Sequence, residues 1–185
     1  MSVGVRTGTL GTRYRYLAPR VLPVPSQVKQ VTQDIIKVSS GMILHAVSVN
    51  GNLDGGFSFQ ITQKYPEVVE LYKSYLKGHP FPADLLGTTL LVPVTSSLFV
   101  AMLFCMSDRG QQRVLEYSAL RLCLAQLAGN AYLAALTEAG GFVYLPYKMG
   151  SGANAGEWSV INTLVDRHLP GAIVCIMPTN SSPKR

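Results

Sequence analysis

A glycine-rich segment, residues 150–156, is the stretch of this chain best suited to hold an anionic ligand. It follows the apolar run 142–146 and precedes the amphipathic run 160–165, so it is predicted to join a buried strand to a helix. Glycine permits φ values that other residues rarely adopt, and the free N–H groups at a helix start attract anions. No Gly-Lys-Ser/Thr follows, and the GxGxxG spacing of dinucleotide-binding folds is absent. The segment therefore predicts an anion-binding turn of neither of these two kinds.

A second glycine-rich loop, residues 50–56, has similar surroundings. It follows the strand-like run 42–47 and precedes a segment in which Phe57, Ile61, Tyr65 and Val68 recur at roughly helical spacing. Two such loops at the carboxyl ends of strands can clasp a pyrophosphate from both sides. The pair therefore predicts a site for a ligand that contains a pyrophosphate.

The elements that must position these loops alternate along the chain. Strands are predicted over residues 28–32, 41–47, 90–94, 98–104, 142–146 and 172–177, and helices over residues 57–76, 116–136 and 158–168. This alternation predicts an α/β protein with a mixed sheet between layers of helices. The chain has 185 residues, 48% of them hydrophobic and 14% charged, which predicts one domain with a well-filled core.

The two loops and their flanks also resemble a known family. Residues 43–48, the loop through Gly56 and residues 60–66 look like the first half of a macro domain, and residues 145–158 look like its second half. Within that family the chain is most similar to the ADP-ribose-1''-phosphate phosphatase-like subgroup of phages, bacteria and yeast. The resemblance covers about residues 30–178 in consistent order. It implies a three-layer α/β/α macro domain with a mixed central sheet, which we expect to occupy residues 28–179.

The resemblance further implies a ligand, ADP-ribose or a derivative, and the residues that contact it. Asp34 is expected to accept a hydrogen bond from the adenine amino group with the Ile35 backbone alongside, although an aspartate just past a strand also suits a helix cap or a turn. The loops are expected to face the distal ribose and the diphosphate through Ser48, Asn50, Gly55, Gly56, Phe57, Gly150, Ser151, Gly152, Ala153 and Asn154. Further contacts are expected from Arg109 or Arg113 near a phosphate, from Met177 near the adenine, and from Tyr147 and Lys148 in the pocket wall.

Two positions depart from the family pattern, and each changes the expected chemistry. Macro domains commonly have Asn where this chain has Ser48, and often Gly where it has Asp54. Ser48 lacks the two N–H donors of an amide side chain. An ionised Asp54 pointing inward would repel a phosphate. The same carboxylate can instead hold a ribose hydroxyl, activate a water as a general base, or face the solvent in a turn.

His45 is the second candidate catalytic residue, beside Asp54. It lies near the end of a predicted buried strand, where the subgroup often places a histidine. The alternative is a hydrogen-bonded histidine of the core. No metal site and no cofactor are predicted, because Cys105, Cys123 and Cys175 stand in apolar contexts, outside any CxxC motif or Cys/His cluster.

The positive charge is concentrated at the two ends of the chain. Residues 1–29 contain five basic and no acidic residues, and the chain ends in Lys184-Arg185, whereas the formal net charge is +6. Residues 1–27 are predicted to be an extended, proline-containing arm, and residues 180–185 a short basic tail. We expect residues 1–29 to bind a protein assembly partner or nucleic acid, although a loosely attached tail has the same composition.

No run approaches the ~18 apolar residues of a membrane span, and no signal-peptide pattern is found. A cytoplasmic protein with no membrane partner is therefore expected, in the host cytoplasm or the virion if a phage encodes it. Three functions stay open. The chain can be an enzyme that hydrolyses ADP-ribose-1''-phosphate or an ADP-ribosyl ester, a macro domain that only binds, or a non-catalytic structural or assembly protein, such as a phage virion component, that docks through its basic arm.

Overall fold

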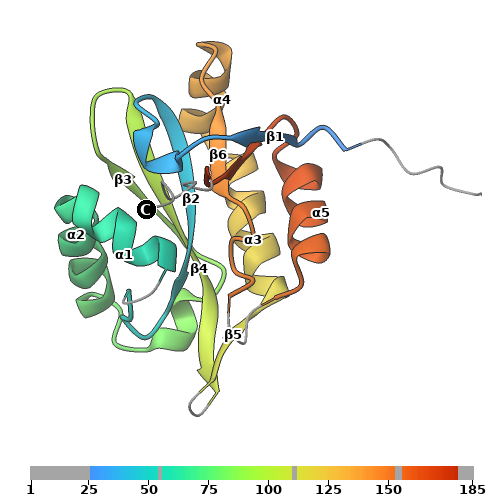
Figure 1. Ribbon diagram of the computed structural model, residues 1–185. Helices are drawn as coiled ribbons and strands as arrows, with labels where there is room; N and C mark the ends of the chain where they lie inside the picture. Colours follow the sequence, from blue (N-terminus) through green and yellow to red (C-terminus); the bar gives the residue numbers. More distant parts are fainter. Residues whose placement is uncertain (1–25, 54–55, 110–111, 153–155, 179–185) are drawn as a thin grey trace, which may run out of the picture.

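A computed structural model describes residues 26–178 of the chain, except residues 54–55, 110–111 and 153–155. Within this part, the strands form one seven-stranded sheet in the order β1-β7-β6-β2-β4-β3, with β5 paired to the carboxyl end of β4 (Figure 1). The strands are β1 (Lys29–Thr32), β2 (Gly41–Ser48), β3 (Thr89–Pro93), β4 (Leu98–Arg109), β5 (Gln112–Leu115), β6 (Val143–Pro146) and β7 (Ile173–Ile176). The α-helices are α1 (Gly56–Lys64), α2 (Pro66–Lys77), α3 (Tyr117–Ala128), α4 (Ala131–Glu138) and α5 (Trp158–His168), and two short 3₁₀ helices are η1 (Ile35–Lys37) and η2 (Pro82–Leu85).

The strand directions bring the predicted loops to one edge of the sheet. Strands β1, β7, β6, β2 and β4 are each parallel to their neighbours in that order, whereas β3 and β5 pair antiparallel with β4. The sheet is therefore mixed, as predicted. Because carboxyl ends of parallel strands share an edge, the segments after β1, β2, β6 and β7 all leave the sheet on the same side.

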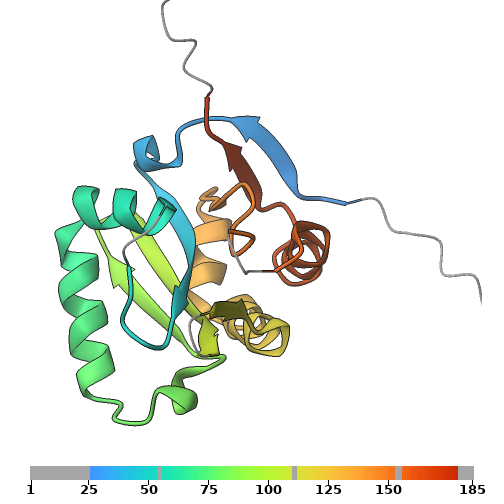
Figure 2. The same cartoon turned by 60° about the horizontal axis from the view of Figure 1, so that its bottom comes forward.

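Helices cover both faces of the sheet, which confirms the predicted three-layer α/β/α architecture. Helices α1 and α2 lie on one face and α3, α4 and α5 on the other (Figure 2). Successive residues of β2 serve the two cores because strand side chains point to alternate faces. Ile43 shares a hydrophobic cluster with Ile61 of α1, whereas Leu44 shares the opposite cluster with Leu120 of α3. All eight residues of β2 are buried, since helices pack on both sides.

Two predicted helices are each broken in two. The helix expected over 57–76 divides at Tyr65, whose backbone is not helical, and Pro66 starts α2 at a position where its missing N–H costs no hydrogen bond. The helix expected over 116–136 divides at Gly129, and the Asn130 side chain then caps α4 by accepting from Tyr132 N at 2.8 Å. Among the described residues no single helix is long and apolar enough to cross a membrane. Helices α3 and α4 together have the necessary length and composition, but they are bent by 60° relative to each other.

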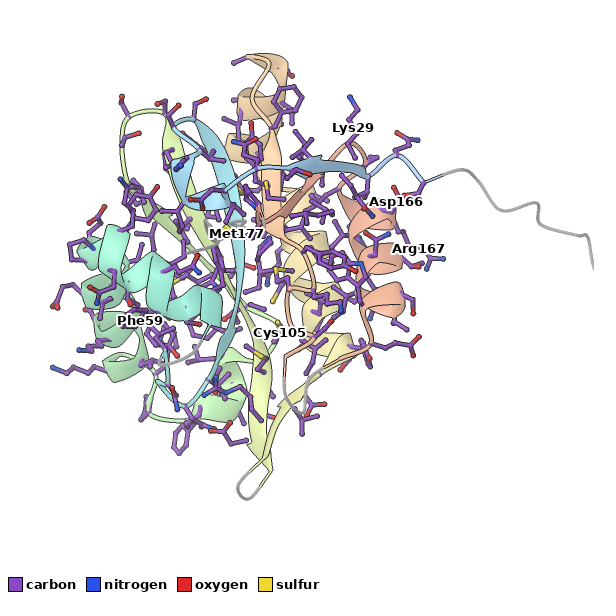
Figure 3. All side chains as sticks on the ribbon, in the orientation of Figure 1. Lys29, Phe59, Cys105, Asp166, Arg167 and Met177 are labelled. Atoms are coloured by element: carbon purple, nitrogen blue, oxygen red, sulfur yellow. The ribbon has the colours of Figure 1, made fainter. Side chains whose placement is uncertain are left out.

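Strand β1 enters the sheet through a contact with α5. Asp166 Oδ1 accepts hydrogen bonds from Gln27 N at 2.8 Å and Val28 N at 3.1 Å, and Lys29 N donates to Ala172 O at 3.0 Å. Figure 3 shows Asp166 on α5 close to Lys29 of β1. The basic arm lies almost wholly outside the described residues, so its predicted docking on protein or nucleic acid stays a prediction.

Candidate functional site

A continuous cleft runs along the carboxyl edge of the sheet, formed by three adjoining cavities of about 430, 340 and 580 Å³. Gln60 and Met177 line both the first and the second cavity, and Phe57 and Tyr147 line both the second and the third. We name the two ends of this cleft the Asp34 end and the His45 end, after the residues that line them. A further cavity of about 560 Å³ lies at the opposite edge, where β6 and β7 begin, and neither glycine loop reaches it.

At the Asp34 end a carboxylate stands beside exposed apolar side chains. Asp34 Oδ1 caps η1 by accepting from Ile36 N at 3.2 Å, so the aspartate is a helix cap and also lines the cleft. Within the described residues its other oxygen accepts no hydrogen bond. Phe59 of α1 and Met177 after β7 line the same cavity although they are 55% and 46% exposed (Figure 3). A carboxylate acceptor beside an apolar rim suits an aromatic ring that carries an amino group.

Two aromatic residues, Phe57 and Tyr147, line the middle of the cleft. Tyr147, which follows β6, contacts Trp158 edge to face with ring centroids 5.5 Å apart. Lys148 Nζ lies 5.4 Å from the Tyr147 ring centroid. Ile35 is buried and lines the middle cavity together with Phe57. Tyr147 and Lys148 are therefore part of the wall, as predicted.

The two glycine loops meet at the His45 end. Gly56, the first residue of α1, lines the largest of the three cleft cavities together with Gly150 and Gly152. The first amides of a helix have no partner within it and carry a partial positive charge. The second loop is closed by a hydrogen bond from Gly156 N to Gly150 O at 2.7 Å, and Gly150 has the left-handed φ of 71°. A Cβ added to Gly152 would meet no atom of the described residues within 4 Å, so on their side this glycine leaves open space.

His45 lines the same cavity and has one ring nitrogen without a hydrogen-bond partner among the described residues. Its side chain is 3% exposed, and its ring lies edge-on to Phe57 with centroids 5.2 Å apart. Nε2 makes no hydrogen bond within the described residues. Burial lowers the pKa of His45 to about 4, so the ring is neutral at pH 7. This nitrogen is buried and lacks the partner that the predicted alternative, a hydrogen-bonded core histidine, would give it, so the catalytic role of His45 stays a prediction.

Several predicted site residues lie elsewhere. Ser48 is fully buried, its Oγ accepts from Asn50 N at 3.2 Å, and it does not line the cleft. The Asn50 side chain donates from Nδ2 to Asp108 Oδ2 at 2.8 Å instead of lining the cleft. Both residues therefore shape the first loop. Asp54, Gly55, Ala153 and Asn154 lie outside the described residues, and Ser151 is described but does not line the cavities. The predicted roles of these five residues stay predictions.

The wall also includes residues that the sequence pattern did not single out as ligand contacts. Phe59 and Gln60 of α1 line the Asp34 end. Phe59 had a usable signal, since it is a large apolar residue between Phe57 and Ile61, off the helical stripe of those two. No group of three or more His, Cys, Asp or Glu residues suited to a metal ion occurs in the described part of the chain.

Comparison with known proteins points to one fold. No protein-family model matches the chain. An ADP-ribose 1''-phosphate phosphatase of Debaryomyces hansenii is 32% identical over 81 residues, a match that covers 38% of this chain and 45% of that protein, so the chain spans less than half of this relative. A macrodomain protein from Streptomyces coelicolor has a TM-score of 0.64 at 21% identity, covering 83% of this chain and 99% of that one. Thermosipho africanus DarTG, solved in complex with ADP-ribose, has a TM-score of 0.62 at 14% identity, covering 85% and 43%.

Proposed function

We propose that this chain, which has the macrodomain fold, binds ADP-ribose or a derivative of it in the cleft at the carboxyl edge of its sheet. The observation that carries the proposal is the continuity of the cleft from Asp34 to His45 through both glycine loops. Each part of the cleft suits one part of such a ligand. The structural match to a protein solved with ADP-ribose and the sequence match to an ADP-ribose 1''-phosphate phosphatase support the same ligand class.

The ligand would lie with its adenine at the Asp34 end. The free carboxylate oxygen of Asp34 would accept from the exocyclic amino group, and the apolar rim of Phe59 and Met177 would contact the ring. The diphosphate would then reach the amino end of α1 at Gly56 and the second loop at Gly152, where backbone N–H groups favour anions. The distal ribose would occupy the His45 end.

Replacing Asp34 tests this orientation. We expect Asp34→Asn to weaken ADP-ribose binding at least about tenfold, since a hydrogen bond between a charged and a neutral group contributes about 1.5–3 kcal/mol. Asparagine keeps an oxygen to cap η1 but turns the second acceptor into a donor, so the local fold is preserved. Isothermal titration calorimetry measures the change.

The matched control ligand is inosine diphosphate ribose, whose base lacks the amino group. Wild type is expected to bind it more weakly than ADP-ribose, and Asp34→Asn is expected to lose that preference. Unchanged discrimination between the two ligands in Asp34→Asn would place the adenine elsewhere.

We further propose that the His45 end hydrolyses a phosphate ester on the distal ribose. In that reaction a water oxygen attacks phosphorus, the bond between phosphorus and the ribose oxygen breaks, and the ribose oxygen takes up a proton. A bound phosphate would raise the pKa of His45 from its low value, because a nearby negative charge favours the imidazolium. His45 would then be able to donate a proton to the leaving oxygen.

Release of inorganic phosphate from ADP-ribose 1''-phosphate measures this activity directly. We expect wild type to release inorganic phosphate steadily, and a variant that no longer binds ADP-ribose 1''-phosphate to release none. Tight binding of ADP-ribose 1''-phosphate without phosphate release would leave the chain a binding module and reject the hydrolase.

A further inference from the structure

The β4–β5 hairpin carries a cation into the His45 end of the cleft. Arg113 of β5 stands opposite Asp108 of β4 in the antiparallel register, and its side chain lines the cavity that His45 and Gly152 also line. Arg113 and Lys148 are the basic residues among the described residues that line this cavity, and none of these lining residues is acidic. This end of the cleft is therefore suited to a ligand with negative charge.

The Arg113 guanidinium keeps donors available for a ligand. Its Nε lies 3.7 Å from Asp108 Oδ1, which is too long for a hydrogen bond. The other oxygen of Asp108 already accepts from Asn50 Nδ2 at 2.8 Å. Nε is shielded from solvent and has no hydrogen-bond partner within the described residues. Asp108 thus orients the guanidinium by charge without a hydrogen bond, which leaves the donors of the guanidinium to an anion that enters the cavity.

The place of Arg113 along the cleft indicates which anion it meets. Gly56 and Phe57, at the start of α1, line both the middle cavity and the His45-end cavity, so the helix terminus stands where the two cavities join. Arg113 lines the His45-end cavity and neither of the other two. Strand β1, which precedes Asp34, and strand β4, which pairs with β5, are separated by β7, β6 and β2. At roughly 4.8 Å per strand spacing they stand about 19 Å apart.

We propose that Arg113 binds a negatively charged group on the distal ribose, so that the cleft selects ADP-ribose derivatives with a terminal phosphomonoester. This inference rests on the proposed binding of ADP-ribose. With adenine at Asp34 and the diphosphate at the start of α1, the distal substituent points toward the hairpin. Arginine suits this task because its planar fork donates two parallel hydrogen bonds to phosphate oxygens.

The test compares two ligands that differ only at the distal ribose. One is ADP-ribose, and the other is a stable analogue of ADP-ribose 1''-phosphate in which a methylene replaces the bridging oxygen, so that hydrolysis cannot consume it. Calorimetry on wild type is expected to show at least tenfold tighter binding of the phosphonate analogue. Arg113→Gln is expected to remove about tenfold of this preference and to leave ADP-ribose affinity within about twofold.

Arg113→Lys separates charge from geometry, since lysine keeps the charge without the fork, and it is expected to retain part of the preference. Arg167→Gln, at an exposed position on α5, is the control and should behave as wild type (Figure 3). Equal weakening of both ligands in Arg113→Gln would assign the arginine to the diphosphate, and no weakening would remove it from the site. Either result overturns the inference. A wild-type protein that binds neither ligand would instead reject the proposed function itself.

Discussion

Replacing Gly152 with valine is expected to weaken ADP-ribose binding at least a hundredfold, or about 2.8 kcal/mol, while the protein stays folded. Gly152 lines the His45-end cavity, and an added Cβ would meet no atom within 4 Å in the part of the chain that the structure describes. Among the described residues there is therefore room for a β-carbon at this position. A valine side chain would leave no room for the ligand phosphates, because the phosphates must approach the backbone N–H groups of this loop closely. Calorimetry with ADP-ribose measures the affinity, and thermal unfolding checks the fold.

Gly129→Val is the matched control, because Gly129 follows α3 outside the cleft and an added Cβ there would have only ordinary contacts, the nearest at 3.7 Å from Ala125 O. This variant should bind ADP-ribose as wild type does. If Gly152→Val remains folded and keeps its affinity, the phosphates bind at another place.

Lowering the pH from 7 to 4 is expected to destabilise wild type by about 3 kcal/mol more than His45→Gln. The pKa of His45 is lowered by burial from 6.5 to about 4 in the folded protein. Between these values the unfolded chain binds a proton that the folded protein does not, so this contribution to stability is present above pH 6.5 and is lost as the pH falls toward 4. A tenfold difference in proton affinity between the folded and unfolded states corresponds to about 1.4 kcal/mol of stability. Urea unfolding at several pH values measures the difference.

His168→Gln provides the control for this experiment. The pKa of His168 is also lowered, first by burial and then by Arg121 and Arg167, but this side chain lies at the surface end of α5, partly open to solvent. Its replacement should leave most of the pH dependence of wild type in place. A pH dependence in His45→Gln equal to that of wild type would show that His45 is protonated, or reaches solvent, in the folded protein.

Local patterns in the sequence determined most of the fold. The apolar runs that precede the two glycine loops are β2 and β6, and the run predicted to close the sheet is β7. These signals are readable because a strand buried on both faces is a nearly continuous run of apolar residues. The break at Pro66 was also available in the sequence, since proline starts a helix more readily than it continues one. The two-stranded extension formed by the end of β4 and β5 was not predicted, because its pairing depends on contacts across a turn.

The sequence by itself determined the class of the site, and the tertiary structure decided which side chains form it. Glycines after two buried strands, and an aspartate after the edge strand β1, are local features, so Gly56, Gly150, Gly152 and Asp34 were found where the cleft lies. The direction of a polar side chain depends on partners distant in the chain. Asn50 turns to Asp108, 58 residues away, and leaves the cleft. Phe59 and Met177 line one cavity, and Arg113 and His45 line another. Both pairs depend on the order of strands in the sheet, because only packing brings these distant segments together.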